Sequence, residues 1–147
     1  MPVLVDTNIL VRAVQRNHPL MRTARQALRS LVENREELCV TYQNIAEFWN
    51  VCTRPADANG LGNSIGATDR LTSRIEMFFT VLPDSPEAFR QWRRLIVAHE
   101  VKGAKVHDAR LAAIMLAHGI TRILTFNAGD FRRYDNVMVL DPLSFLS

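Results

Sequence analysis

Short apolar segments alternate along the chain with longer segments whose apolar residues recur every three to four positions. The first apolar segment, Val3-Leu4-Val5, contains no polar residue, as expected for a central parallel strand that is buried on both faces. The pattern predicts further strands at residues 38–42, 81–82, 122–126 and 137–140. Helical spacing between the strands predicts helices after position 8 and at residues 19–35, 44–52, 67–80, 86–101 and 108–118.

Short strands that alternate with longer helices are typical of α/β proteins. We therefore predict a three-layer α/β/α domain with a mainly parallel sheet of about five short strands. Residues 1–147 contain no repeat, low-complexity stretch or linker, and this length suits a single domain. Residues 53–66 contain Pro55, Gly60 and Gly62 and predict a long loop, which in a compact domain is often functional.

Composition narrows the class of protein. A hydrophobic fraction of 48% and a charged fraction of 22% are typical of a globular protein and exclude a disordered one. No apolar run approaches the roughly 18 residues that span a bilayer, and no secretory signal is present, so we expect a cytoplasmic protein that does not bind membranes. Cys39 and Cys52 are too few for a disulfide framework or a zinc site, and we expect buried, reduced thiols.

Four acidic residues lie where an apolar segment gives way to a turn or to the start of a helix: Asp6, Glu47, Asp108 and Asp130. In an open parallel sheet, ligands bind beyond the carboxyl ends of the strands. Carboxylates gathered there would form an oxygen-only site that suits Mg²⁺ or Mn²⁺. The pattern therefore favours metal-assisted hydrolysis of phosphodiesters.

Asp6 and Glu47 each have a structural alternative. Asp6 suits the cap of the following helix, although Thr7 or Asn8 could serve as the cap and leave the carboxylate free. Glu47 projects away from the apolar stripe of its predicted helix, as a glutamate that merely faces solvent also would.

Asp108 and Asp130 also have alternatives. Asp108 lies on the same helical face as Leu111 and Met115, where a carboxylate is costly unless it caps the helix, is paired or binds a metal. Asp130 follows a strand in a turn with Asn127, which offers a neutral oxygen that could support a metal site.

The segment Val-Leu-Val-Asp-Thr-Asn-Ile-Leu at residues 3–10 resembles the start of PIN-domain proteins. Glu47, the segment Val-His-Asp-Ala-Arg-Leu-Ala-Ala and the segment Ile-Leu-Thr-Phe-Asn-Ala-Gly-Asp-Phe resemble the later motifs of the same family. The loop at residues 53–62 is similar to that of the toxin subgroup called VapC. The resemblance covers essentially the whole chain, with the motifs in order and at matching spacing.

This resemblance implies a PIN fold and an endoribonuclease that depends on Mg²⁺ or Mn²⁺, acts as a toxin, is neutralised by a cognate antitoxin protein and forms a homodimer. It places the catalytic and metal-binding roles on Asp6, Glu47, Asp108 and Asp130. It places supporting roles on Thr7, Asn8, Thr125 and Asn127. Position 127 is acidic in some members of the family and Asn here, which leaves the number of tightly bound metals open.

Charged and aromatic residues add candidate contacts. The net charge is +3, and Lys102 and Lys105 are the only lysines among 18 basic residues, which fits an RNA substrate or an acidic protein but equally a general preference for arginine. Candidate RNA-binding residues are Arg54, Arg110, Arg132 and Arg133. Candidate residues for either the core or an antitoxin or dimer surface are Trp49, Met77, Phe78, Phe79 and Trp92.

Other chemistries remain open. Hydrolysis by metal-activated water leaves a 5′-phosphate and a 3′-hydroxyl, whereas histidine acid–base catalysis on the ribose leaves a cyclic phosphate. His107 and His118 are eleven residues apart on a predicted helix, about 16 Å, and cannot share one phosphate. An aspartyl-phosphate hydrolase would place a second acid at position 8, which is Asn. A PIN nuclease that is not a toxin and a non-catalytic binding module are the remaining alternatives.

Overall fold

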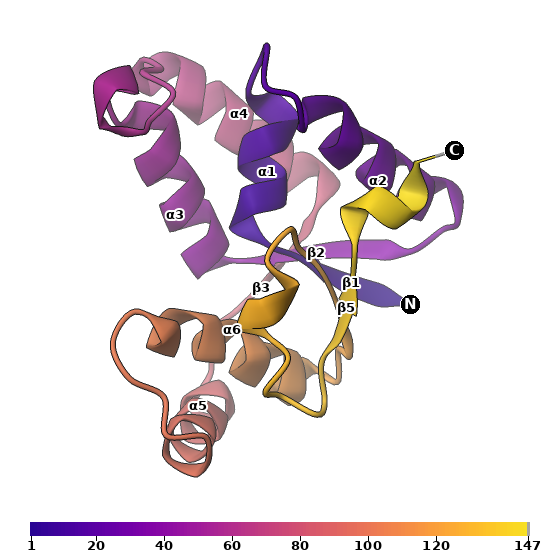
Figure 1. Cartoon of the computed structure of the whole chain (residues 1–147), viewed down its shortest axis with the longest axis vertical. Helices are drawn as coiled ribbons and strands as arrows, with labels where there is room; N and C mark the ends of the chain where they lie inside the picture. Colours follow the sequence, from indigo (N-terminus) through magenta and orange to yellow (C-terminus); the bar gives the residue numbers. More distant parts are fainter. Residues whose placement is uncertain (147) are drawn as a thin grey trace.

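Five parallel strands form one sheet in the computed structural model, which describes residues 1–146 (Figure 1). The order across the sheet is β3-β2-β1-β4-β5. The strands are β1 (Pro2–Val5), β2 (Glu37–Thr41), β3 (Thr80–Leu82), β4 (Arg122–Leu124) and β5 (Met138–Leu140). All four neighbouring pairs are parallel, which confirms the predicted sheet.

Helices cover both faces of this sheet. The helices are α1 (Thr7–Val14), α2 (Met21–Glu33), α3 (Tyr42–Thr53), α4 (Ile65–Phe78), α5 (Pro86–Ala98) and α6 (Lys105–His118). Short 3₁₀ turns are η1 (Ala56–Ala58), η2 (Ala128–Asp130) and η3 (Pro142–Phe145). In Figure 1, α1 to α4 lie above the sheet and α5 and α6 below it, so the prediction of three layers is confirmed.

Several predicted boundaries were wrong, and local hydrogen bonds explain them. Tyr42, predicted to end a strand, begins α3 because the Thr41 hydroxyl accepts a hydrogen bond from the Asn44 amide and caps the helix. The strand predicted at 122–126 ends at Leu124, since the backbone N–H of Phe126 donates to Asn8 Oδ1 instead of to a neighbouring strand.

Other helix boundaries also differ from the prediction, and the helix predicted at residues 19–35 spans Met21–Glu33. Helix α4 begins at Ile65 rather than at position 67, because the Ser64 hydroxyl accepts from the Ala67 amide. Helix α5 ends at Ala98, and Glu100 follows with a left-handed backbone (φ 52°). Helix α6 begins at Lys105, three residues before Asp108.

Strand β1 is buried on both faces, as its sequence predicts. Leu4 packs into the apolar core that the sheet shares with α5 and α6, whereas Val3 and Val5 pack into the core beneath α1 to α4. Cys39 lies in the first core and Cys52 in the second, both as free thiols. Burial raises the pKa of both cysteines to about 11, so both stay protonated at neutral pH, which confirms the prediction of reduced core thiols.

The direction in which successive strands are added to the sheet reverses at β1. Strands β2 and β3 are added on one side of β1, and β4 and β5 later on the other side. The crevice beyond the carboxyl ends of β1 and β4 is therefore the switch point where open α/β sheets bind ligands. The backbone N–H of Asp6 donates to Leu124 O at 3.0 Å, and this hydrogen bond joins the carboxyl ends of β1 and β4. No helix within residues 1–146 is long and apolar enough to cross a membrane.

Candidate active site

A cavity of about 320 Å³ lies at this switch point, and all four predicted acidic residues line it. They reach it from four separate segments: Asp6 from the end of β1, Glu47 from α3, Asp108 from α6 and Asp130 from η2. The four residues thus line one cavity, although Glu47 reaches it from the middle of α3 and not from a helix start as the pattern suggested. We refer to this cavity as the acidic pocket.

Asp6 is held rigidly at the bottom of the acidic pocket. Its side chain is only 9% exposed, and its Oδ1 atom accepts a hydrogen bond from the backbone N–H of Thr7 at 2.8 Å. Oδ2 accepts from Thr125 Oγ1 at 2.8 Å and from Asn8 Nδ2 at 3.4 Å. Of the two alternatives for the cap of α1, the structure shows that Asp6 itself is the cap and that neither Thr7 nor Asn8 replaces it.

The supporting residues of the first and last motifs are joined to each other. Thr125 is 1% exposed, and its hydroxyl oxygen accepts from Asn8 Nδ2 at 3.2 Å and from the backbone N–H of Asn127 at 3.0 Å. Asn8 Oδ1 in turn accepts from the backbone N–H of Phe126 at 3.2 Å. These contacts fix the loop after β4 against the start of α1, and the side chain of Asn127 lies exposed at the pocket.

Asn44 was not predicted from the sequence, although it positions Glu47. The Asn44 side chain is fully buried, and its Oδ1 accepts from the backbone N–H of Thr41, completing a capping box. Its Nδ2 donates to Thr7 Oγ1 at 3.0 Å, and Thr7 Oγ1 donates to Glu47 Oε1 at 3.4 Å. The spacing Thr-x-x-Asn before an apolar stripe was the signal for this cap.

Asp108 lies on the buried stripe of α6, next to Leu111, Ala112 and Met115, as predicted. Ala104 is the N-cap of α6, so the alternative that Asp108 caps the helix was wrong. Burial raises the pKa of Asp108 to about 6, and the negative charges of Asp130 and Asp6 add to the rise.

Asp130 forms an ion pair with Lys105, which was not predicted. Lys105 is the first residue of α6 and lies three positions before Asp108, so its charge also acts on Asp108 and opposes the rise of the pKa of that residue. The ammonium group therefore offsets part of the negative charge of the acidic pocket.

The four carboxylates act on one another through space. Burial raises the pKa of Asp6, hydrogen bonds from Thr125 and Thr7 oppose that rise, and the charges of Glu47 and Asp130 add to it. Mutual repulsion of this kind is relieved by a cation. The donor set contains only oxygen, which suits a hard ion such as Mg²⁺ or Mn²⁺.

The spacing of these carboxylates bears on the type of metal binding. Within residues 1–146, no three acidic, histidine or cysteine side chains lie close enough together to enclose an ion. This spacing still fits Mg²⁺, which keeps several of its waters and binds through one or two carboxylates rather than inside a protein cage. The acidic pocket therefore fits a partly hydrated divalent ion.

Only one of the predicted RNA-binding arginines lies at the acidic pocket. Arg54 lines it, as does Arg12, which was not predicted. Arg110 instead pairs with Asp84 at 3.7 Å and lines a separate cavity between α5 and α6. Arg133 lines a third cavity with Lys102 and Lys105, and Arg132 is exposed on the surface.

The histidines lie apart from the acidic pocket. The rings of His99 and Tyr134 meet edge to face with centroids 5.1 Å apart, and His18 Nδ1 accepts from the backbone N–H of Leu20 at 3.0 Å. His118 Nε2 lies 3.3 Å from Pro83 O, and His107 lines the cavity between α5 and α6. In the described part of the chain, none of the side chains that line the acidic pocket is a histidine.

Comparison with known proteins identifies the family. The model of the PIN domain matches residues 3–137. The chain belongs to the PIN-domain family. Ribonuclease VapC23 of Mycobacterium tuberculosis is 27% identical to this PIN domain over 125 residues, which are 85% of this chain and 92% of that protein.

Solved structures share the fold of this PIN domain. VapBC-1 from nontypeable Haemophilus influenzae matches with a TM-score of 0.73 and 16% identity, over 97% of this chain and 99% of that chain. VapC20 of Mycobacterium tuberculosis, described as a Sarcin-Ricin loop cleaving toxin, matches with a TM-score of 0.67 and 16% identity, over 90% and 95%. At such identities these two matches establish the architecture, and they confirm the fold predicted from the sequence.

Proposed function

We propose that this PIN domain is a ribonuclease that hydrolyses RNA phosphodiester bonds with Mg²⁺ or Mn²⁺, and that it is the toxin of a type II toxin–antitoxin pair of the VapBC type. The observation that carries the proposal is the convergence of Asp6, Glu47, Asp108 and Asp130 on one pocket at the switch point of the sheet. The similarity to ribonuclease VapC23 and to structures of VapBC complexes supports the choice of RNA and of a toxin.

The four acidic residues would hold one or two divalent ions, which supply the Lewis acidity that activates water for attack on phosphorus. Asp6 is oriented before any ligand binds, because its two oxygens accept from Thr7 and Thr125. Thr7 orients Glu47 in the same way through its hydroxyl group. The guanidinium groups of Arg12 and Arg54, which line the pocket, can bind the phosphate that is cleaved. The expected products carry a 5′-phosphate and a 3′-hydroxyl.

Incubation of a labelled single-stranded RNA with the purified protein tests this mechanism. Cleavage is expected with Mg²⁺ or Mn²⁺ and is expected to stop in EDTA and in the variants Asp6→Asn and Asp108→Asn. Asp69→Asn is the matched control, since Asp69 is an exposed carboxylate on α4. Cleavage that continues in EDTA, or that leaves 2′,3′-cyclic phosphate ends, would overturn the mechanism.

An apolar cavity of about 260 Å³ between α1, α2 and α4 supports the proposal that this protein binds a protein partner. Its lining includes Leu10, Leu71 and Ile75, with Phe78 at its edge. The side chains of Met77 and Phe78 are 76% and 71% exposed, whereas Trp49, Phe79 and Trp92 are half-buried. An amphipathic helix of the antitoxin could bury its apolar face here. We therefore assign this surface, rather than the tryptophans, to the antitoxin.

Expression in a bacterial host tests the role as a toxin. Growth arrest is expected from the wild type but not from Asp6→Asn, and co-expression of the cognate antitoxin is expected to relieve it. Phe78→Glu is expected to keep the nuclease activity and lose the relief. RNA cleavage without growth arrest would instead favour a PIN nuclease that is not a toxin. If the protein neither cleaves RNA nor arrests growth, a non-catalytic module is favoured. We also propose that the protein forms a homodimer, as the family resemblance implies, and the mass of the purified protein in solution tests this.

A further inference from the structure

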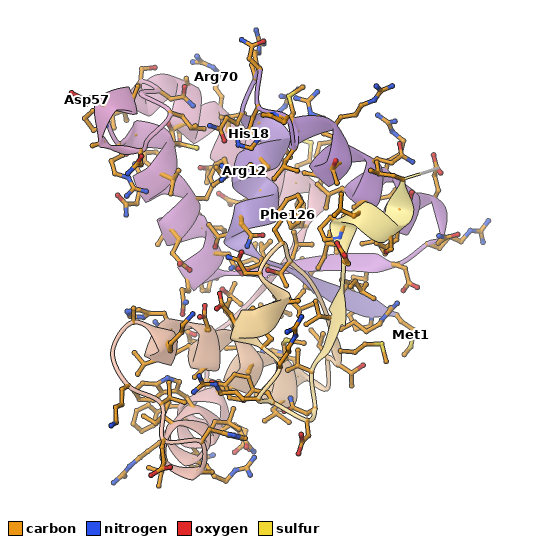
Figure 2. All side chains as sticks on the ribbon, in the orientation of Figure 1. Met1, Arg12, His18, Asp57, Arg70 and Phe126 are labelled. Carbon is orange, nitrogen blue, oxygen red and sulfur yellow. The ribbon has the colours of Figure 1, made fainter. Side chains whose placement is uncertain are left out.

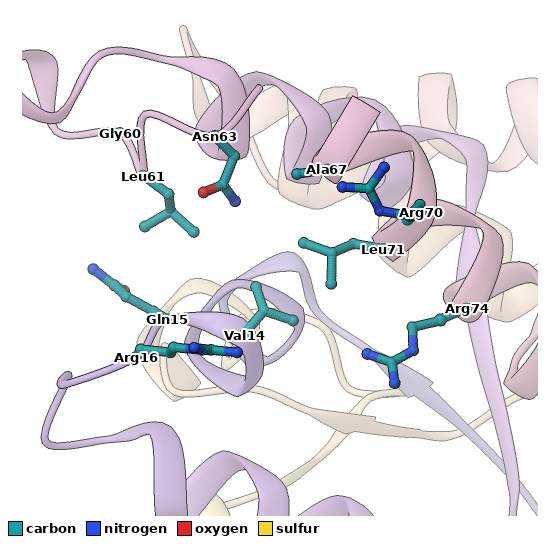
Figure 3. Close-up of a pocket in the computed structure, with 10 residues that line it drawn as sticks. All are labelled: Val14, Gln15, Arg16, Gly60, Leu61, Asn63, Ala67, Arg70, Leu71 and Arg74. Atoms are coloured by element: carbon teal, nitrogen blue, oxygen red, sulfur yellow. The ribbon is translucent and has the colours of Figure 1, made fainter. Parts of the chain in front are cut away.

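A further cavity, of about 680 Å³, lies beside the acidic pocket and is lined by positively charged side chains. Its walls come from the end of α1, the loop before α4 and α4 itself (Figure 3). Arg16 lies on one wall and Arg70 and Arg74 on the other, while the side chains of Leu61 and Leu71 point toward the middle (Figure 3). We refer to this cavity as the arginine groove.

The arginine groove continues directly from the acidic pocket. Along α1, Arg12 lines the acidic pocket and Gln15, less than one turn further on, lines the groove. The two side chains are joined by a hydrogen bond of 2.6 Å from Arg12 Nη1 to Gln15 Oε1. In the loop, Asn59 lines the acidic pocket and its neighbour Gly60 lines the groove. The two cavities thus form one path of which the carboxylates occupy one end.

Among the described residues, the arginines along this path form no ion pair. Ion pairs within residues 1–146 use Arg90, Arg110 and Arg122, but none of the arginines of the path. These are Arg12, Arg16, Arg54, Arg70 and Arg74. Arg54 Nε is moreover buried and, among the described residues, has no hydrogen-bond partner. Figure 2 shows Arg12 and Arg70 on the same half of the molecule. The described lining of the arginine groove contains Arg16, Arg70 and Arg74 but no carboxylate, and guanidinium groups in such a setting are suited to bind phosphates.

The loop at residues 59–63, which lines both cavities, is held in place by hydrogen bonds. The backbone N–H groups of Leu61 and Asn63 donate to carbonyl groups at the end of α3, at 3.0 and 2.8 Å. The N–H of Gly62 donates to Arg54 O at 2.9 Å. A Cβ atom at position 60 would lie only 2.0 Å from Arg54 O, so the chain can pass this point only with glycine. The wall is therefore formed before a ligand binds, which lowers the entropic cost of binding.

We propose that the arginine groove binds the backbone of single-stranded RNA next to the phosphate in the acidic pocket, with Arg16, Arg70 and Arg74 contacting neighbouring phosphates. This inference rests on the proposed ribonuclease function. The apolar side chains of Val14, Leu61 and Leu71, which line the groove, can pack against the faces of bases, which a single strand exposes and a duplex does not. Contacts of this kind position the strand and do not select a sequence.

RNA fits this path better than an acidic protein segment does. An acidic segment that followed the groove would bring its carboxylates against Asp6, Glu47, Asp108 and Asp130 at the end of the path. A phosphodiester meets the same carboxylates only through the divalent ions that they are proposed to hold, which neutralise both sides.

Fluorescence anisotropy with a labelled single-stranded RNA of about 20 nucleotides tests the proposal. Measurements in EDTA keep the RNA intact and separate binding from cleavage. The triple variant Arg16→Gln/Arg70→Gln/Arg74→Gln is expected to bind about tenfold more weakly or worse, and the slope of log K against log salt is expected to fall by about 2, since each phosphate contact contributes about 0.7. The control Arg22→Gln/Arg29→Gln/Arg93→Gln removes the same charge from exposed positions on α2 and α5 and is expected to stay within about twofold of wild type.

Equal weakening in both triple variants would show only a general effect of charge and would overturn the proposal. If the triple variant Arg16→Gln/Arg70→Gln/Arg74→Gln loses binding to poly-glutamate but still binds RNA, the proposal is overturned in favour of an acidic protein ligand. If the triple variant does not fold, the single variants Arg16→Gln and Arg70→Gln are expected each to lower the salt slope by about 0.7.

The outcomes also separate this proposal from the nuclease function. A wild type that binds RNA through these arginines but cleaves none with Mg²⁺ or Mn²⁺ would refute the nuclease and leave the groove intact. A wild type that cleaves RNA while the triple variant binds and cleaves equally well would refute the groove alone. If the nuclease function and the groove proposal are both correct, the triple variant is expected to have a higher KM and a nearly unchanged kcat.

Discussion

Thr125 Oγ1 donates a hydrogen bond of 2.8 Å to Asp6 Oδ2, although 119 positions separate the two residues in the sequence. The bond crosses the switch point between β1 and β4, and both side chains are buried. The hydroxyl group lowers the pKa of a carboxyl group that burial raises. Thr125 thus keeps Asp6 oriented and more readily ionised at the bottom of the acidic pocket.

The isosteric change Thr125→Val is expected to lower the free energy of unfolding by about 1–3 kcal/mol, because it leaves buried Asp6 with one fewer donor. It is also expected to weaken Mg²⁺ binding by about 10- to 100-fold, since Asp6 loses its orientation. Urea unfolding and titration with Mg²⁺ measure the two effects. The control is Thr72→Val on α4, since Thr72 Oγ1 is buried and has no partner among the described residues. This control is expected to be neutral or stabilising, and an equal loss in both variants would refute the role of Thr125.

Divalent ions are expected to raise the melting temperature of the wild type, because an ion that binds only the folded protein stabilises it. At an ion concentration of about 100 times Kd the gain is about 2.7 kcal/mol. Asp6→Asn is expected to show little of this shift, whereas Asp69→Asn is expected to retain it, since Asp69 lies exposed on α4. Differential scanning fluorimetry with Mg²⁺ and Mn²⁺ measures the shifts. Equal shifts in all three proteins would argue against the acidic pocket as the metal site.

The metal-free protein is expected to lose stability as the pH rises from about 4 to about 6. Asp108 has a pKa of about 6 in the fold and 3.8 as its ordinary value, so the folded state binds more protons in this window. The loss is complete above the folded pKa. Because the side chain is partly exposed, we expect a loss of about 1–2 kcal/mol.

Asp108→Asn removes this titration and tests its origin. The variant is expected to be more stable than wild type at pH 7 in EDTA, and its stability is expected to vary less between pH 4 and 6. Urea unfolding across this range gives the comparison. An unchanged pH profile would mean that Asp108 titrates normally and that the carboxylates do not repel each other.

Gly60→Ala is expected to destabilise the loop between α3 and α4 by about 1–3 kcal/mol, because the added methyl group would overlap Arg54 O and Arg54 Cβ. The displaced loop is expected to weaken RNA binding in the arginine groove as well. Gly129→Ala is the matched control for stability, since a Cβ atom at position 129 has no atom within 4 Å. Similar unfolding curves for both variants would show that the loop can move away from Arg54.

Local patterns were sufficient to predict the layers and most of the elements. Val3-Leu4-Val5 has no polar residue because both of its faces are buried, and a strand with that property must lie between helices. The positions of Asp6, Glu47, Asp108 and Asp130 at strand ends and on helices were also visible in the sequence. Boundaries were predicted less well, since Thr41 and Ser64 set the starts of α3 and α4 through single hydrogen bonds from nearby amides.

The sequence by itself determined the fold, the family and the acidic residues, because each depends on the order of apolar and polar residues along the chain. Only the tertiary structure showed that Thr125 donates to Asp6, that Asn44 orients Thr7 and that Lys105 pairs with Asp130. Only the tertiary structure showed that Arg16 lines one wall of the arginine groove and Arg70 and Arg74 the other. The physical reason is that hydrogen bonds and Coulomb interactions depend on distances in space, and the folding of β1 against β4 and of α1 against α4 creates those distances between residues far apart in the chain.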